Sequence, residues 1–305
     1  MNNTEKRKKK MKTWLVLAGA MMAFLLTLPA CKEKNGPEKA EAERTNEHTV
    51  ILESDSLTRN TVFTTSRGES CEIASTLVIQ YPKQIAATDG ETGISVDSLQ
   101  RLFITHVLDA GDSLSLRQAI ERCVDNSLHQ YDFMQEEEME DATEPQDGHV
   151  TVVADSGSVI KYVTKTTVSL IRDKDHVVTF CRVDVTNKNG RVVSLTHRYY
   201  NFDINTMSLI TPAKLFRVDA VGEVNQLLRN TLLKQNNVKN NDQLNDLGYY
   251  NVENIMVSSN FYVTDDGITW SFLPNELAVE AVGEPLIHLD FDSLSPFWGQ
   301  VKYFD

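Results

Sequence analysis

The chain has 305 residues, of which 41% are hydrophobic, and it carries a formal net charge of −13 at pH 7. This length suffices for one large domain or two modest ones. The excess of carboxylates argues against nucleic acid as a partner, because such binding requires Lys and Arg to neutralise phosphates, and it argues against docking on anionic lipid.

The first 30 residues have the three parts of a secretory signal peptide. Lys6 to Lys12 form a basic segment, Thr13 to Leu28 form an uncharged run of 16 residues, and the small residue Ala30 follows. The run is short for a permanent membrane span, which needs roughly 20 apolar residues. We therefore interpret 1–30 as a signal peptide.

The end of this segment, Leu28-Pro29-Ala30-Cys31, resembles the bacterial lipobox, in which the cysteine thiol takes a diacylglyceryl group. Lipidation at Cys31, with palmitate-like acyl chains, would anchor the chain to a cell-envelope membrane, either on its periplasmic face or at the outer membrane. An ordinary signal peptide with a chance cysteine is the alternative. Residues 1–30 contain six Lys/Arg and one Glu, so their removal changes the net charge to −18. Either a solvated surface or a cationic partner accounts for that charge.

Residues 31–60 are rich in Lys, Glu, Asn and Thr, which predicts a disordered tether. Three cysteines follow, Cys71, Cys123 and Cys181, and none has the spacing of a zinc or redox motif. Two arrangements fit an exported protein: one disulfide with one free thiol, or three buried thiols.

A first sub-domain, residues 61–155, is predicted to contain one strand and two helices. The strand spans 71–82 and ends at a proline, the first helix spans 96–109 with Ser95 as its cap, and the second opens at Ser115. An acidic run over 136–148 follows, and it lacks the regular alternation of a calcium loop, so we interpret it as a solvated helix end and loop.

A second sub-domain, residues 156–305, begins with a segment in which apolar residues occupy every second position. Three strands between 162 and 202 are predicted, with Asn189-Gly190 as a hairpin turn. A helix over 219–235, a polar loop and two more strands after Asn260 complete it. The expected fold class is α+β: an antiparallel β-meander with helices packed on one side, in two sub-domains.

Two stretches are similar to a known family. The first runs from Tyr199 through Asp203 to Thr206 and on to Leu215-Phe216, and it resembles the family's "yyNfDl-tG" strand and turn followed by a "dlF" step. The second runs from Asn260 to Phe272 and on to Gly283, and it resembles the closing motif of two strands, a Gly turn and a Glu-containing helix start. The family is the RsiV-like C-terminal domain family, which is paired with an upstream domain of unknown function. The chain keeps His197 but lacks the glycines that usually precede it.

This resemblance implies a module that recognises a protein outside the cell, since the RsiV anti-sigma factor senses lysozyme. Only 12 residues precede the apolar run, so we expect no anti-sigma role. The family also occurs ahead of the catalytic domain of some peptidoglycan deacetylases. Because the sequence ends at Asp305, we expect no such domain here.

The sequence lacks the Gly-x-Ser-x-Gly, His-Glu-x-x-His and Gly-rich phosphate-loop motifs. His197, Arg198 and Asp203 are candidates for a polar binding site, and Glu276 is a further candidate behind Pro274. Trp270, Phe272 and Trp298 could form a carbohydrate-stacking set, but core positions on one strand explain the first two better. No catalytic residue, metal site or cofactor is predicted.

Three functions are therefore carried forward. The favoured one is a non-catalytic, lipid-anchored envelope module that binds a protein, lysozyme-like by resemblance, or a cell-wall glycan. The first alternative is a cell-wall-directed hydrolase with a site near His197 and Glu276. The second alternative is an accessory subunit of an envelope complex.

Overall fold

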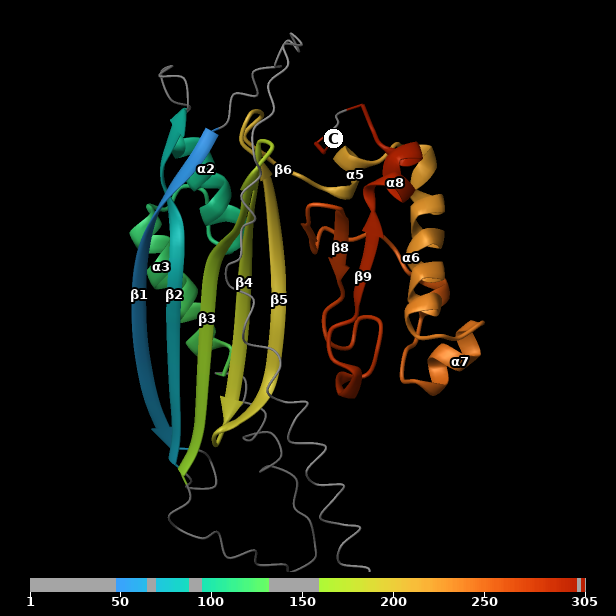
Figure 1. Ribbon diagram of the computed structural model, residues 1–305. Coiled ribbons are helices and arrows are strands. Elements are labelled where there is room, and N and C mark those ends of the chain that lie inside the picture. The colour runs from blue at the N-terminus through green and yellow to red at the C-terminus, as the bar shows by residue number, and fades with distance from the viewer. Residues whose placement is uncertain (1–47, 65–69, 88–94, 132–158, 301–302, 305) are drawn as a thin grey trace, which may run out of the picture. The chain divides into compact units, whose positions relative to one another are not determined.

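The computed structural model describes residues 48–64, 70–87, 95–131, 159–300 and 303–304. The predicted signal peptide, Cys31 and the acidic run 136–148 lie outside these ranges. Within them, no helix combines the length and the apolar character needed to cross a membrane. The predicted α+β class is confirmed, because a six-stranded sheet and a small three-stranded sheet are combined with helices (Figure 1).

The large sheet has its strands in chain order, and every neighbouring pair is antiparallel except β2 and β3. Its members are β1 (His48–Thr64), β2 (Ser70–Ala87), β3 (Val159–Lys174), β4 (Val177–Lys188), β5 (Arg191–Asp203) and β6 (Ser208–Leu209).

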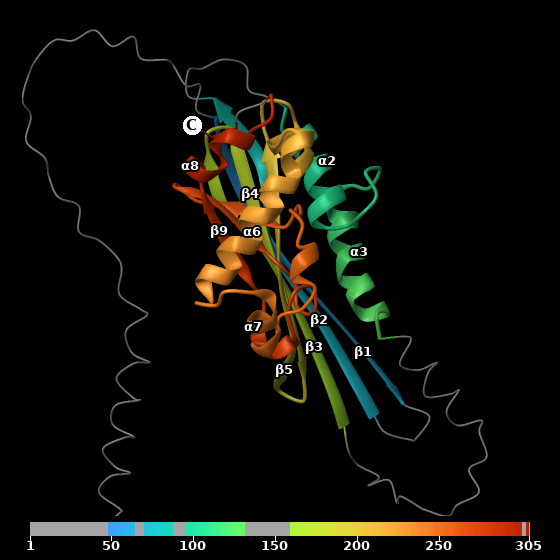
Figure 2. The ribbon, with the colours of Figure 1, turned by 90° about the vertical axis from the view of Figure 1, so that its right-hand side faces the viewer.

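The parallel pairing of β2 with β3 requires a crossover, and the helices provide it. These are α2 (Val96–Leu102), the π-helical turn η1 (Phe103–Val107) and α3 (Leu116–His129), which lie against one face of the sheet (Figure 2). Ser95 caps α2 and Ser115 begins α3, as the sequence predicted, and Ser115 also forms a capping box with Gln118. The apolar side of both helices packs on the sheet, which makes one hydrophobic core.

The tether predicted over 31–60 is too long at its C-terminal end, because β1 already begins at His48. β1 pairs with β2 along its whole length, yet many of its side chains are exposed. An edge strand needs few apolar residues, so the polar composition of residues 48–60 was interpreted as that of a linker.

The predicted end of β2 at Pro82 is also wrong, because the strand continues to Ala87. Its pairing with β3 stops at Ile79, so the missing N–H of Pro82 interrupts no ladder on that side. The pairing of β2 with β3 also places strands from both predicted sub-domains, 61–155 and 156–305, in one sheet.

The meander of β3, β4 and β5 is confirmed. Its second turn is Asn189-Gly190, with φ of 51° and 79°, the left-handed pair that a two-residue hairpin needs. The first turn lies at Asp175 and His176, which also have positive φ.

The C-terminal part builds a second core around α6 (Val221–Gln235) and the small sheet. That sheet contains β7 (Phe261–Val263), β8 (Gly267–Ser271) and β9 (Leu286–Asp290), paired antiparallel in this order. Short helices connect these elements: α5 (Pro212–Leu215), η3 (Val218–Ala220), α7 (Asn241–Asp246), η4 (Val252–Asn254), η5 (Glu280–Val282), α8 (Phe291–Leu294) and η6 (Ser295–Phe297). The predicted helix over 219–235 is confirmed as α6, and the predicted polar loop contains α7 and η4.

The cysteines Cys71, Cys123 and Cys181 are all buried and form no disulfide with one another. This is the second of the two alternatives, three buried thiols.

Candidate functional site

His197 lies on β5 and is held by a residue that the sequence did not single out. Its Nδ1 lies 2.6 Å from Glu284 Oε2, and its backbone N–H donates to Glu284 Oε1 at 2.7 Å. Glu284 follows η5, so this contact ties the large sheet to the C-terminal part. Cys181 and Tyr199 are neighbours on the same face, and burial raises the pKa of both, that of Cys181 to about 11.

Arg198 points to the opposite face of β5 from His197, because successive side chains of a strand alternate. Its Nη1 lies 3.2 Å from Asp184 Oδ2. Asp184 also accepts from Arg182 Nε at 2.9 Å and from Thr166 Oγ1 at 2.6 Å. Arg182 in turn donates to the Val107 carbonyl at the end of η1. This partly buried network fastens the π-helical turn to the sheet.

Asp203 and Glu276 hold local turns. Asp203 Oδ1 accepts from the backbone N–H groups of Asn205 and Thr206, which is the turn that the sequence predicted. Glu276 Oε2 accepts from the Leu273 N–H at 2.8 Å. Among the described residues, no hydrogen bond or ion pair joins His197 to Glu276, Arg198 or Asp203, so the contacts do not gather the candidates into one site.

The aromatic candidates belong to the core. Trp270 and Phe272 are buried, with 0% and 3% exposure. Trp298 is half-buried and stacks on Phe216 with ring centroids 5.5 Å apart and an interplanar angle of 6°. Burial leaves Trp270 and Phe272 no face for a sugar ring.

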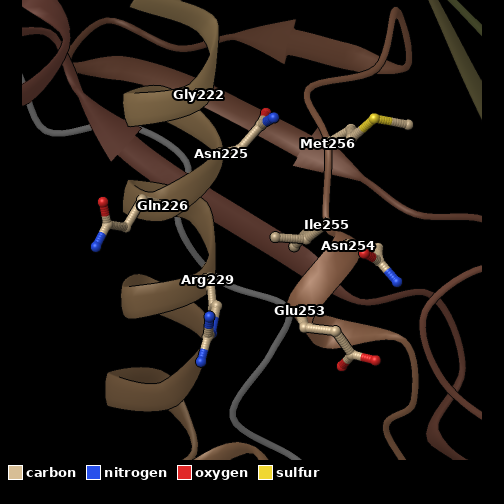
Figure 3. A pocket seen from close by; sticks show the side chains of 8 residues that line it. All are labelled: Gly222, Asn225, Gln226, Arg229, Glu253, Asn254, Ile255 and Met256. Carbon is tan, nitrogen blue, oxygen red and sulfur yellow. The ribbon is translucent and has the colours of Figure 1, made fainter.

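A groove between α6 and the segment around η4 is the best-formed candidate site (Figure 3). It has a volume of about 620 Å³, within the range of small-ligand sites. One wall is a stripe of α6, and the other consists of η4 and the extended segment that follows it. The lining residues are Gly222, Asn225, Gln226, Arg229, Glu253, Asn254, Ile255 and Met256.

The walls of this α6–η4 groove are held in place by side-chain hydrogen bonds. Asn225 Oδ1 accepts from the Val257 N–H at 2.9 Å, which fixes the extended wall to the helix. Arg229 Nε donates to Asn241 Oδ1 at 3.1 Å, and its other guanidinium nitrogens have no hydrogen-bond partner in the described part of the chain.

The groove offers opposite charges at one end and an apolar surface at the other. Arg229 and Glu253 lie on facing walls at one end, whereas Gly222 and Met256 lie at the other (Figure 3). Met256 is 67% exposed, and Ile255 behind it is buried. A thioether is an adaptable contact surface. A guanidinium binds anionic groups, and a carboxylate binds cationic groups.

A second hollow of about 750 Å³ lies beside α5 and the C-terminal end, with lining residues that include Lys214, Arg217, Gln300 and Tyr303. Its lining flanks residues 301–302, which lie outside the described ranges. Both walls of the α6–η4 groove lie well inside a described range, so this groove is preferred.

The sequence contained a signal for the groove. Gly222, Asn225, Gln226 and Arg229 have the spacing i, i+3, i+4, i+7, which places them on one side of a helix. Only the apolar stripe of this helix was used to predict it. The facing wall starts 24 residues after Arg229, at Glu253, and no local pattern connects the two.

Residues 213–292, which include the whole groove, match the model of a family described as a protein of unknown function, DUF3298. A solved structure of a DUF3298 family member from Bacteroides fragilis is similar, with 19% identity and a TM-score of 0.60 over 84% of this chain and 96% of that chain. A DUF3298 family protein from Pseudomonas aeruginosa has 12% identity and a TM-score of 0.46, over 83% of this chain and 97% of that chain.

The likeness to the Bacteroides structure shows a shared fold. The Pseudomonas structure is too distant to support an argument. No curated protein sequence matches the chain. Residues 213–292 are thus similar to DUF3298, and the RsiV-like features beyond that match stay a prediction. In the part of the chain that the structure describes, no group of three or more His, Cys, Asp or Glu could hold a metal ion.

Proposed function

We propose that this protein is a non-catalytic binding module, lipid-anchored at Cys31 in the cell envelope, that binds another protein through the α6–η4 groove. The observation that supports it is the groove itself, which carries a guanidinium, a carboxylate and an exposed thioether on two walls fixed by hydrogen bonds. A site that is already formed needs little ordering when it binds.

The lining favours a polypeptide over a glycan. Asn254 and Gln226 provide amide donors and acceptors that match the N–H and C=O groups of a peptide, while Met256 provides an apolar contact for one side chain. Sugar rings are typically bound against an exposed aromatic face, and none of the eight described lining residues is aromatic.

The charge of the chain favours a cationic partner. The formal charge is −13, or −18 once residues 1–30 are removed, and such a surface accelerates encounter with a basic protein. Glu253 would pair with a Lys or Arg of that partner. Lysozyme is the probe that the RsiV-like resemblance suggests.

Binding is tested with immobilised lysozyme and the full chain in detergent at low and high salt. We expect retention at low salt that falls at high salt, because exposed charges are screened. Absence of retention at both concentrations would contradict lysozyme as the partner. Displacement by soluble cell-wall glycan fragments, with no effect of an unrelated basic peptide, would instead identify a glycan site.

The anchor is tested separately. Inhibition of lipoprotein signal peptidase should leave an uncut precursor that retains residues 1–30. Normal processing under inhibition would contradict lipidation at Cys31, whatever the groove binds.

A further inference from the structure

The second hollow, beside α5 and the C-terminal end, carries positive charge on a chain that is strongly negative. Its volume is about 750 Å³, and Lys214 and Arg217 both line it. None of its ten described lining residues is acidic, although the chain contains 43 Asp and Glu residues against 30 Lys and Arg. A hollow lined by charges of one sign attracts ligands of the opposite sign.

Arg217 is held so that part of its guanidinium stays available. Its Nη1 donates to the Pro296 carbonyl at 2.7 Å, and its Nε lies 3.4 Å from Asp219 Oδ1. The contact with Asp219 is weak, because the two side chains are 50% and 80% exposed. In the described part of the chain, Nη2 has no hydrogen-bond partner. A guanidinium that is oriented on one side and open on the other is suited to an oxyanion.

Lys214 provides the second positive charge, and its ammonium forms no ion pair with any described residue. Its backbone lies against Gly299, where a Cβ would be only 3.1 Å from the Lys214 carbonyl oxygen. The Gly299 N–H donates to the Leu215 carbonyl at 2.7 Å. These contacts hold the C-terminal segment beside α5, so that Gln300 lines the same hollow as Lys214.

Gln300 and Tyr303 add two neutral donors, and neither side chain has a hydrogen-bond partner among the described residues. Burial, and then the nearby Asp203 carboxylate, raise the pKa of Tyr303, so its O–H keeps its proton at neutral pH and can donate. Asp203 itself is 4% exposed and accepts three hydrogen bonds from Asn205 and Thr206. Its charge is therefore already compensated by local donors.

This set of donors matches a phosphate monoester better than a carboxylate. A phosphate monoester has three terminal oxygens and a charge of about −1.5 to −2 at neutral pH, so it can balance two cations and accept from several donors. A carboxylate has two oxygens and a single charge. Val218 also lines the hollow and is 89% exposed, so it offers an apolar contact beside the charged groups.

We propose that the second hollow binds a phosphate monoester, with the phosphoryl group on Lys214 and Arg217 and the organic group against Val218. A soluble phosphate ester and a lipid headgroup share this chemistry. The site is separate from the α6–η4 groove, and it does not depend on what that groove binds.

Calorimetric titration of the full chain in non-ionic detergent tests the ligand class, with the heats of titration into detergent alone subtracted. Phenyl phosphate should bind saturably. Benzoate has the same ring but less charge and one oxygen fewer, so it should bind about tenfold more weakly. Inorganic phosphate should also bind more weakly, because it has no ring to contact Val218. Equal affinity for benzoate and phenyl phosphate would overturn the proposal, and equal affinity for inorganic phosphate would contradict the contact with Val218.

Matched variants test the residues. Lys214→Gln and Arg217→Gln should each raise the dissociation constant of phenyl phosphate about tenfold. Lys214→Gln removes no ion pair within the described chain, so the fold should be kept, and circular dichroism checks this. Lys234→Gln makes the same change of net charge on α6, outside the hollow, and should change the constant less than twofold. Equal effects of Lys214→Gln and Lys234→Gln, or no saturable binding by the wild type, would overturn the proposal.

The source of the phosphoryl group is distinguished with dihexanoyl phosphatidate, a soluble lipid with a monoester headgroup, in the same titration. Binding that is tighter than that of phenyl phosphate and is weakened by Lys214→Gln would support the proposal and identify a lipid ligand. Weaker binding than that of phenyl phosphate, with the same dependence on Lys214, would support it and identify a soluble ester. Binding that Lys214→Gln leaves unchanged would contradict the site.

Discussion

Glu284 binds His197 at two points, with one carboxylate oxygen on the imidazole Nδ1 and the other on the backbone N–H of the same residue. The side chain of Glu284 is 13% exposed and that of His197 is 31% exposed. The two residues are 87 positions apart, and their contact joins β5 of the large sheet to the segment between η5 and β9. Glu284 therefore has a structural role, which is to hold these two parts of the chain together through His197.

Glu284→Ala is expected to lower the free energy of unfolding by about 1–3 kcal/mol, because it leaves the His197 N–H without its acceptor. Glu284→Gln keeps an oxygen for that N–H and should cost less. Urea unfolding measures both. Glu276→Ala, at an exposed carboxylate, is the control and should change stability by less than about 1 kcal/mol. Equal losses for Glu284→Ala and Glu276→Ala would contradict this role.

Asp184→Ala is expected to destabilise the fold by about 3–5 kcal/mol, because it leaves the Arg182 guanidinium buried without its counter-charge. The Arg182 side chain is only 15% exposed. Arg198→Ala removes a partner of the same carboxylate, but Arg198 is 43% exposed, so a loss of about 0–1 kcal/mol is expected. Thermal unfolding of the two variants, side by side, checks the contrast.

Cys181 should make the fold less stable in alkali. Burial raises its pKa from 9.0 to about 11, so the unfolded chain loses this proton first as the pH rises. The contribution of this thiol to the free energy of unfolding is therefore fully present below about pH 9, and it is lost as the pH rises toward about 11. Cys181→Ala should flatten this part of the pH–stability curve relative to wild type. At neutral pH the raised pKa lowers the thiolate fraction about a hundredfold, so alkylation of Cys181 in the native fold should be slow. Superimposable pH–stability curves, or fast alkylation, would refute this account.

Two glycines should respond to alanine in opposite directions. A Cβ at Gly267 would overlap the Leu289 carbonyl oxygen and lie 2.9 Å from Asp290 Cα in the paired strand β9. Gly267→Ala is therefore expected to cost about 1–3 kcal/mol. A Cβ at Gly222 on α6 meets no atom within 4 Å, and Gly222→Ala should stabilise the chain by about 0.4–1 kcal/mol. The melting temperatures of the two variants show whether each substitution stabilises or destabilises the fold.

The sequence predicted those elements whose side chains repeat with one period and whose ends carry local signals. Ser95 and Ser115 marked helix starts correctly, and Asn189-Gly190 marked a hairpin. β1 was missed because an edge strand tolerates polar residues at most positions. The parallel pairing of β2 and β3 was missed because it depends on a crossover and not on a turn.

The candidate site was less predictable than the fold. His197 was selected from the sequence, but its partner Glu284 is remote in the chain and no periodic pattern points to it. The groove combines one side of α6 with a segment that begins at Glu253 and has no regular structure beyond η4. Only packing of the second core brings these two walls together.

The role of the α6–η4 groove is tested most directly by the dissociation constant of the lysozyme complex in matched charge variants. Glu253→Gln removes one negative charge inside the groove, and Asp265→Asn removes one from the turn between β7 and β8, where that side chain is 87% exposed. We predict that Glu253→Gln raises the constant about tenfold, whereas Asp265→Asn changes it less than twofold. Equal effects of the two variants, or none from Glu253→Gln, would contradict binding through the groove.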